Sequence, residues 1–190
     1  MNVFEHFRKE GYVVLERVID KDEVARIREI GFEVLEEKRL QGTPGVYTKT
    51  CVEYADILNA AFNDKVTKKI KEAFGDDYLT FSQFSLTANS LSPIWHTDSQ
   101  SHQNAEYLFN ENYNVSKCGL YLQEDDPTYG GGLEIIPRSH LPSLLGYRTF
   151  IGRDRKYGKI SFLQWKASTL RRRFLKRVRL DLKAGDVLLF

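Results

Sequence analysis

A histidine and an aspartate two positions apart are the residues in this chain best suited to metal chemistry. His96 and Asp98 lie within residues 92–99, directly after a run that is typical of a β-strand. Because side chains at positions i and i+2 of an extended chain point to the same side, this imidazole and this carboxylate can bind one metal ion together. They are two of the three ligands of the two-His-one-carboxylate set that holds Fe(II) in non-haem sites. The alternative interpretation is that His96 is an exposed histidine and Asp98 an aspartate in a turn, with no metal. The motif alone does not distinguish these two interpretations, so the rest of the chain must be considered.

The composition is that of an ordinary soluble domain. The chain has 190 residues, of which 42% are hydrophobic and 28% charged, enough for one domain with its own core. A formal net charge of +2 gives no reason to expect a nucleic-acid or membrane partner. Cys51 and Cys118 form no CxxC motif, which favours a reduced, cytoplasmic protein. We find neither a signal peptide at the N-terminus nor an apolar run long enough for a membrane span.

The first 75 residues have mainly helical patterns. We predict a short helix at residues 4–8, a strand at 11–15 and a long helix that starts after Asp20 and ends near Gly42. Asp20 and Glu23 have the spacing of a capping box. The apolar face of the long helix is predicted to be Val24, Ile27, Gly31, Val34 and Leu35. Two further helices are expected, at residues 52–62 and between Asn63 and Gly75, the latter with Val66, Ile70 and Phe74 on one face.

The second half of the chain has strand patterns instead. Strands are predicted at residues 78–88, 118–123, 133–136, 178–182 and 187–190. Residues 100–116 are polar with scattered aromatic side chains, which is typical of a long loop or an active-site lid. Helices followed by many short strands favour an α+β, mainly β domain: an all-β core with a helical layer against it.

Four stretches of the chain, in this order, resemble one known family. They are the strand and helix that begin at Phe7, residues 95–98 (Trp-His-Thr-Asp), residues 131–140 (Gly-Gly-Leu-Glu-Ile-Ile-Pro-Arg-Ser-His) and residues 184–190 (Ala-Gly-Asp-Val-Leu-Leu-Phe). The family is the phytanoyl-CoA dioxygenase family of Fe(II)/2-oxoglutarate-dependent oxygenases. The four stretches span nearly the whole chain.

This resemblance implies a fold and a reaction. The implied fold is a double-stranded β-helix, a jelly-roll of two sheets, with the N-terminal helices packed on one sheet. His96 and Asp98 would bind Fe(II), and 2-oxoglutarate would chelate the same metal. With O2, such enzymes hydroxylate a small-molecule substrate and release succinate and CO2.

The chain departs from the family pattern at its end. The family carries a second histidine ligand, and an arginine that pairs with the far carboxylate of 2-oxoglutarate, after the strand that corresponds to residues 187–190. We therefore expect the third ligand after Phe190, a single domain at 1–190 that is C-terminally incomplete, and a 190-residue form that is inactive. We also expect residues 187–190 to be an edge strand with an exposed apolar side. His140 is a second candidate for the third ligand, but a hydrogen bond within its own turn is favoured because the matching family histidine is not a ligand.

Three further residues are candidates for binding 2-oxoglutarate or substrate. Gln83 and Asn89 flank the strand that leads to the His96 motif, and Tyr121 lies in the predicted strand at 118–123. An ordinary hydrogen bond within a strand is the alternative interpretation for Gln83 and Tyr121. His102 lies in the predicted lid, where exposure to solvent or substrate is favoured over metal binding.

Residues 171–179 contain six basic side chains. A solvent-exposed face is favoured, because Arg177 and Arg179 alternate with Val178 and Leu180 as on an exposed strand. A patch that binds phosphate, nucleic acid or an acidic substrate group is the alternative.

Two function classes remain open. The first is the oxygenase described above, favoured by the intact His96–Asp98 pair. The second is a non-catalytic jelly-roll that keeps the fold and binds a ligand or a partner, favoured by the missing distal half of the site. A radical halogenase is disfavoured, because such enzymes replace the carboxylate ligand with a small residue and Asp98 is present.

Overall fold

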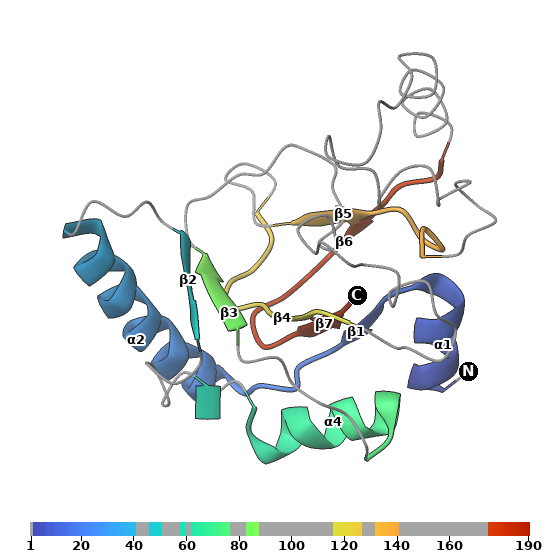
Figure 1. The fold of residues 1–190 in the computed structure, drawn as a ribbon, viewed down its shortest axis with the longest axis horizontal. Coiled ribbons are helices and arrows are strands. Elements are labelled where there is room, and N and C mark those ends of the chain that lie inside the picture. Colours follow the sequence, from blue (N-terminus) through green and yellow to red (C-terminus); the bar gives the residue numbers. More distant parts are fainter. Residues whose placement is uncertain are drawn as a thin grey trace, which may run out of the picture.

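The structure is a computed structural model that describes residues 2–40, 46–50, 58–59, 62–76, 83–87, 116–126, 132–140 and 175–190. Helices and antiparallel strands make up this part of the chain (Figure 1). The elements are α1 (Val3–Glu10), β1 (Val13–Leu15), α2 (Lys21–Leu40), β2 (Val46–Thr50), α4 (Asp64–Phe74), β3 (Gln83–Thr87), β4 (Cys118–Leu120), β5 (Leu133–Ile135), β6 (Val178–Leu180) and β7 (Val187–Leu189). No helix in the described ranges is both long enough and apolar enough to cross a membrane.

The two ends of the chain meet in one sheet. Its strand order is β1-β7-β4, and both pairings are antiparallel. Leu188 lies opposite Val14 on one side and opposite Gly119 on the other. Two further antiparallel pairs, β2-β3 and β5-β6, complete the sheets that the described residues form.

The expectation that residues 187–190 form an edge strand is wrong. β7 is the central strand of its sheet, and Val187, Leu188 and Leu189 are at most 1% exposed. Phe190 continues the pairing, because it exchanges two backbone hydrogen bonds with Lys117, of 2.7 and 3.0 Å. The strand therefore has neighbours on both sides, and it exposes no apolar edge.

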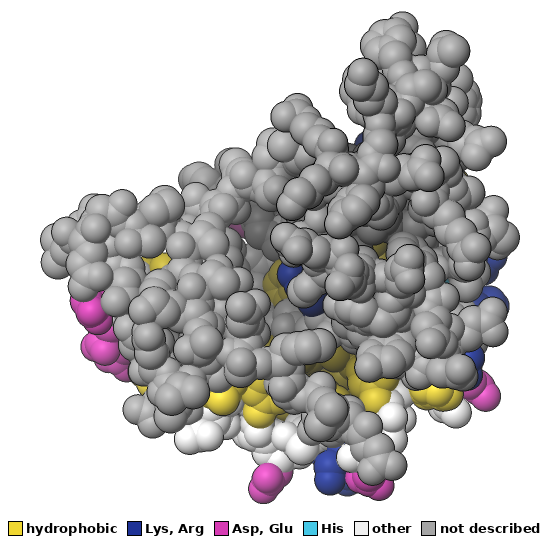
Figure 2. Space-filling model, in the orientation of Figure 1, with side chains coloured by type: hydrophobic (Ala, Val, Ile, Leu, Met, Phe, Trp, Pro, Cys, Tyr) yellow, Lys and Arg dark blue, Asp and Glu magenta, His cyan; other side chains and the backbone are white. Residues whose placement is uncertain are grey.

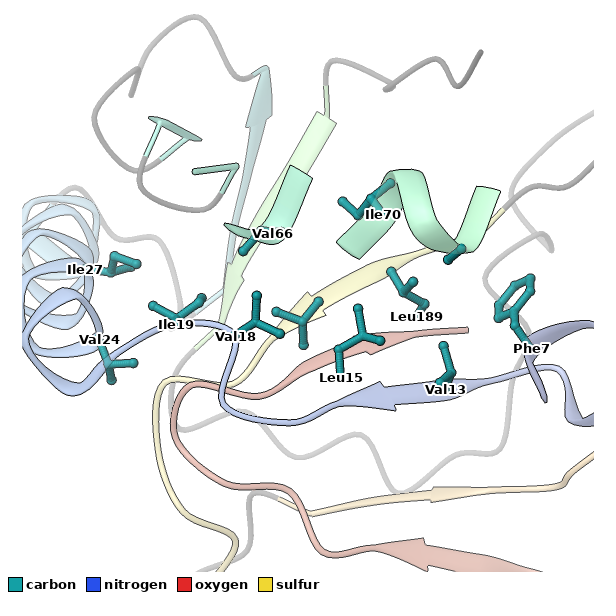
Figure 3. Close-up of a cluster of buried hydrophobic side chains, with 12 residues drawn as sticks. Phe7, Val13, Leu15, Val18, Ile19, Val24, Ile27, Val66, Ile70 and Leu189 are labelled. Carbon is teal, nitrogen blue, oxygen red and sulfur yellow. The ribbon is translucent and has the colours of Figure 1, made fainter. Parts of the chain in front are cut away.

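A helical layer covers one face of this sheet. Successive side chains of a strand point to opposite faces, so Val13 and Leu15 of β1 share a face with Val187 and Leu189 of β7. Figure 3 shows this face meeting side chains from the helices. The cluster adds Phe7 of α1, Val24 and Ile27 of α2, and Val66, Ile70 and Ala73 of α4. Burial of this shared apolar surface holds helices and sheet together.

The second face of the same sheet packs against β5 and β6. Leu188 of β7 points to this side, together with the half-buried Val14 of β1. Leu180 of β6 and Leu182 join the cluster, as do Leu133 and Ile135 of β5. The described elements thus form three layers: helices, the β1-β7-β4 sheet and the β5-β6 pair. The predicted helical layer against antiparallel strands is confirmed in this part of the chain.

The helices begin where their capping residues predict. Asn63 accepts a hydrogen bond from the Val66 N–H at 3.0 Å and Gly75 ends α4, so both predicted bounds of this helix are confirmed. Asp20 caps α2 by accepting from the Glu23 N–H at 3.1 Å. The second hydrogen bond of the predicted capping box would run from the Asp20 N–H to the Glu23 carboxylate. It does not form, because the Glu23 carboxylate binds the Arg26 guanidinium instead. The predicted apolar face of α2 is confirmed for Val24, Ile27 and Val34, which are at most 5% exposed.

The β2-β3 pair lies beside α2 (Figure 1). Val34 of α2 is buried against the half-buried Leu86 of β3. β3 confirms the core of the strand predicted at 78–88, whereas β2 was not predicted. Of the helix predicted at residues 52–62, only 58–59 are described as helical, and the predicted lid at 100–116 lies outside the described residues.

Candidate functional site

The two predicted iron ligands fall between described elements. His96 and Asp98 lie outside the described residues, as do Asn89 and His102. The strand before them, β3, ends at Thr87, and the next described strand, β4, begins at Cys118. Among the described strands, β3 precedes and β4 follows the motif in the sequence, and the ligand assignment stays a prediction.

Gln83 is the first residue of β3. Its backbone lies opposite Thr50 of β2, so the residue belongs to a regular antiparallel pair. Its side chain is outside the described part of the structure. A role in holding 2-oxoglutarate therefore stays a prediction for Gln83.

Tyr121 directly follows β4 and is tied to the turn that precedes β7. Its N–H donates to the Asp186 carbonyl oxygen at 3.0 Å, and its carbonyl accepts from the Gly185 N–H at 2.8 Å. Its ring packs in the cluster between the two sheets. Burial, together with the nearby Asp125 carboxylate, raises the pKa of the Tyr121 phenol to about 12. The phenol is therefore protonated at neutral pH, as an unperturbed tyrosine also is, and can donate a hydrogen bond.

His140 makes its contact with α1 and not within its own turn. Its Nε2 atom lies 2.9 Å from the Arg8 carbonyl oxygen, so this nitrogen carries the donated proton. The prediction that His140 forms a hydrogen bond within its own turn is therefore wrong, because the partner is a carbonyl of α1. The ring lies against Gly11, which has φ +83° and ends α1, and a Cβ at position 11 would overlap the ring. His140 thus binds one of the carbonyls that the last turn of α1 leaves unpaired.

The neighbouring Arg138 holds the same end of α1. Its backbone N–H donates to the Glu10 carbonyl at 2.7 Å, and its guanidinium binds the Glu10 carboxylate through Nε at 3.1 Å and Nη2 at 2.9 Å. These hydrogen bonds lower the pKa of Glu10 from its usual value. Sequence patterns did not indicate this pair, because the partners are 128 positions apart.

Arg179, in the basic run, also has a specific partner. Its Nη2 atom lies 2.9 Å from Asp125 Oδ1, and its Nε lies 3.2 Å from Oδ2. The Asp125 side chain is only 9% exposed, whereas that of Arg179 is 52% exposed. The favoured interpretation of an exposed strand face holds for Arg179, which also anchors the segment after β4.

A metal ion needs several donor side chains at one point. Within the residues that the structure describes, no three His, Cys, Asp or Glu side chains form such a group. His140 uses Nε2 for Arg8, and Asp186 uses both carboxylate oxygens for backbone N–H groups. His96 and Asp98 lie outside these residues, and their role as Fe(II) ligands stays a prediction from their residue types.

The comparison with protein families gives one match. A sequence model described as phytanoyl-CoA dioxygenase matches residues 7–190, which is most of the chain. The comparison with curated proteins finds no match. The matched region includes the described strands of all three sheets as well as His96 and Asp98. The chain belongs to the phytanoyl-CoA dioxygenase family.

Proposed function

We propose that this protein is a non-haem Fe(II)- and 2-oxoglutarate-dependent dioxygenase that hydroxylates a small-molecule substrate. The observation that carries the proposal is the His96-x-Asp98 pair in a chain that matches an oxygenase family over residues 7–190. Members of this family depend on Fe(II) and 2-oxoglutarate. We propose no narrower substrate class than small molecules, because proteins with the same fold act on many different substrates.

Different residues of this chain would bind the metal and 2-oxoglutarate. The neutral His96 imidazole and the ionised Asp98 carboxylate would hold Fe(II), since metal ligands bind in their deprotonated forms. Bound Fe(II) and 2-oxoglutarate supply the chemistry, in which O2 is reduced, 2-oxoglutarate becomes succinate and CO2, and one oxygen atom enters a substrate C–H bond. Gln83, Asn89 and Tyr121 would donate hydrogen bonds to the 2-oxoglutarate carboxylates. The protonated Tyr121 phenol is suited to this role.

The same proposal includes the jelly-roll fold for residues 1–190 as a single domain. Support comes from the β1-β7-β4 sheet and the β5-β6 pair, which bury one apolar cluster between them. Two sheets packed face to face are the basic unit of a jelly-roll. A cytoplasmic location is part of the proposal too, from the absence of a disulfide-type cysteine pattern.

The direct test is succinate formation by protein expressed from the complete gene. Fe(II), O2 and 2-oxoglutarate are supplied, with and without a chelator, to the wild type, to Asp98→Ala and to Asp76→Ala. Asp76 is a matched control, because its side chain is 85% exposed and pairs only with Lys71 in the described part of the structure. We expect chelator-sensitive turnover in the wild type and Asp76→Ala, and none in Asp98→Ala. Folded wild-type protein that forms no succinate in either condition would favour the non-catalytic jelly-roll.

A further inference from the structure

A cavity of about 450 Å³ lies between α1, the residues after β5 and the residues before β6. This volume falls in the range of about 300–1,000 Å³ that small-molecule sites have. α1 and the residue that precedes β1 contribute His6, Glu10 and Tyr12 to its wall. None of the residues assigned to Fe(II) or 2-oxoglutarate lines it among those that the structure describes.

One side of the cavity is apolar. Ile136, Pro137, Leu175 and Val178 line it, and all four are half-buried. These side chains belong to the two segments that flank the β5-β6 pair, which is part of the core between the sheets. A ligand seated here would remove apolar surface from water, which favours a ligand with an apolar body.

The charged groups of the cavity favour an anion. The carboxylate of Glu10 is neutralised by the bidentate guanidinium of Arg138. The ammonium of Lys176 is exposed and has no acidic partner among the described residues. Counted over the described residues alone, one positive charge without an acidic partner therefore remains on the cavity wall. Figure 2 shows Lys and Arg side chains gathered along the margin of the molecule where α1 lies in Figure 1.

Two aromatic rings add polar atoms to the wall. His6 and Tyr12 pack edge to face, with ring centroids 5.6 Å apart and an interplanar angle of 80°. Neither the imidazole nitrogens of His6 nor the Tyr12 hydroxyl make a hydrogen bond within the described residues. Both rings also line a second cavity, of about 330 Å³. Edge-to-face packing holds these rings in place, which presents their polar atoms at low cost in conformational entropy.

We propose that this cavity binds a small molecule that joins an oxyanion, a carboxylate or a phosphate, to an apolar body. Lys176 pairs with the oxyanion, His6 and Tyr12 donate hydrogen bonds, and Leu175 and Val178 contact the apolar body. The site goes beyond the proposed dioxygenase function, because its binding requires neither Fe(II) nor 2-oxoglutarate.

The test is a ligand-observed NMR titration of the metal-free full chain. The probes are phenylacetate, phenyl phosphate, the neutral isostere phenylacetamide and inorganic phosphate, which lacks the apolar body. The protein variants are Lys176→Met, Lys176→Arg and Lys68→Met. Lys68 is a matched control on α4, because it is exposed and lines neither cavity. Circular dichroism verifies that each variant is folded.

We expect phenylacetate or phenyl phosphate to bind, and the tighter of the two identifies the headgroup. Lys176→Met should weaken this binding by roughly threefold to tenfold, the range for an exposed to partly desolvated charge pair. Lys176→Arg and Lys68→Met should bind as the wild type does, and phenylacetamide and inorganic phosphate should bind less tightly. Three results would each overturn the proposal: equal binding of phenylacetamide, equal effects of Lys176→Met and Lys68→Met, or no saturable binding of either anion at millimolar concentration.

Discussion

Asp186 binds the backbone of Arg17 across 169 positions of the chain. Its Oδ1 accepts the Arg17 N–H at 2.9 Å, and its Oδ2 accepts the Lys183 N–H, also at 2.9 Å. Asp186 is 2% exposed, and Arg17 has φ +50°. One buried carboxylate thus joins the turn after β1 to the turn before β7, the two strands that pair in the central sheet.

Asp186→Ala should lower the free energy of unfolding by about 2–4 kcal/mol, because it leaves two backbone N–H groups without their charged acceptor. Asp186→Asn should cost less, since an amide keeps one acceptor oxygen. Urea unfolding followed by circular dichroism measures both changes. Asp181→Ala is the control, because that side chain is 86% exposed and should change stability by less than about 0.5 kcal/mol. Equal effects of Asp186→Ala and Asp181→Ala would contradict the role assigned to Asp186.

Gly185→Ala should be among the most destabilising single substitutions in the described part of the chain. Gly185 has φ +96°, and an added Cβ would overlap the Ile19 carbonyl oxygen. The same two residues are joined by a 3.0 Å hydrogen bond from the Ile19 N–H to the Gly185 carbonyl, so the overlap would push this contact apart. We expect a loss of at least about 2 kcal/mol in urea unfolding, from left-handed strain plus the clash.

Gly119→Ala provides the matched comparison for Gly185→Ala. A Cβ at position 119 would meet its nearest atom, in Tyr121, at 3.5 Å, an ordinary contact. This substitution in β4 should leave stability nearly unchanged. If Gly185→Ala were tolerated as well as Gly119→Ala, the close approach of Gly185 to Ile19 would be refuted.

Cys118 should react slowly with alkylating reagents in the folded protein. Burial raises the pKa of its thiol to about 11 from an ordinary value of 9.0. Because the thiolate is the nucleophile, this shift should reduce the rate at pH 8 by about 100-fold. Iodoacetamide labelling followed by peptide mass spectrometry measures the rate at position 118 with and without urea. Equal rates in the two conditions would show that Cys118 is not protected.

The Glu10–Arg138 pair should make stability depend on pH. The hydrogen bonds from Arg138 place the folded-state pKa of Glu10 below its ordinary value of 4.5. A carboxyl with a lowered folded-state pKa stabilises the fold above its unfolded-state pKa, and this contribution is lost as the pH falls through the folded-state value. Glu10→Gln should therefore be less stable than the wild type at pH 7, and the difference should shrink below pH 4.5.

Urea unfolding at a series of pH values tests the Glu10 prediction. Glu16→Gln is the control for the loss of one surface carboxylate, because Glu16 is exposed and makes no ion pair within the described residues. A difference between Glu10→Gln and the wild type that stays constant from pH 7 to pH 4 would contradict the assigned pair.

Local sequence signals predicted the local structure well. The bounds of α4 followed from Asn63 and Gly75, and the start of α2 followed from Asp20, because capping depends on residues three or four positions apart. β2 was missed even though its residues suit a strand, because the evidence for it is its pairing with β3, more than thirty positions away.

Long-range partners could not be read from the same patterns. The central position of β7 depends on pairing with β1 at the other end of the chain, and the contact between His140 and Arg8 spans 132 positions. Such pairings are selected by tertiary packing, and neither periodicity nor turn chemistry encodes them. The two predicted iron ligands, His96 and Asp98, fall within one short motif, so a local pattern was enough to propose them, and their assignment stays a prediction.

Anaerobic titration of Fe(II) and 2-oxoglutarate tests the central claim most directly. The absorbance of the ternary complex is compared in the wild type, Asp98→Ala and His140→Ala. His140 is the control, because its Nε2 is already bound to the Arg8 carbonyl of α1. We predict a saturable absorbance band in the wild type and in His140→Ala, and its loss in Asp98→Ala. A band that survives in folded Asp98→Ala and disappears in His140→Ala would contradict the assignment of the iron site.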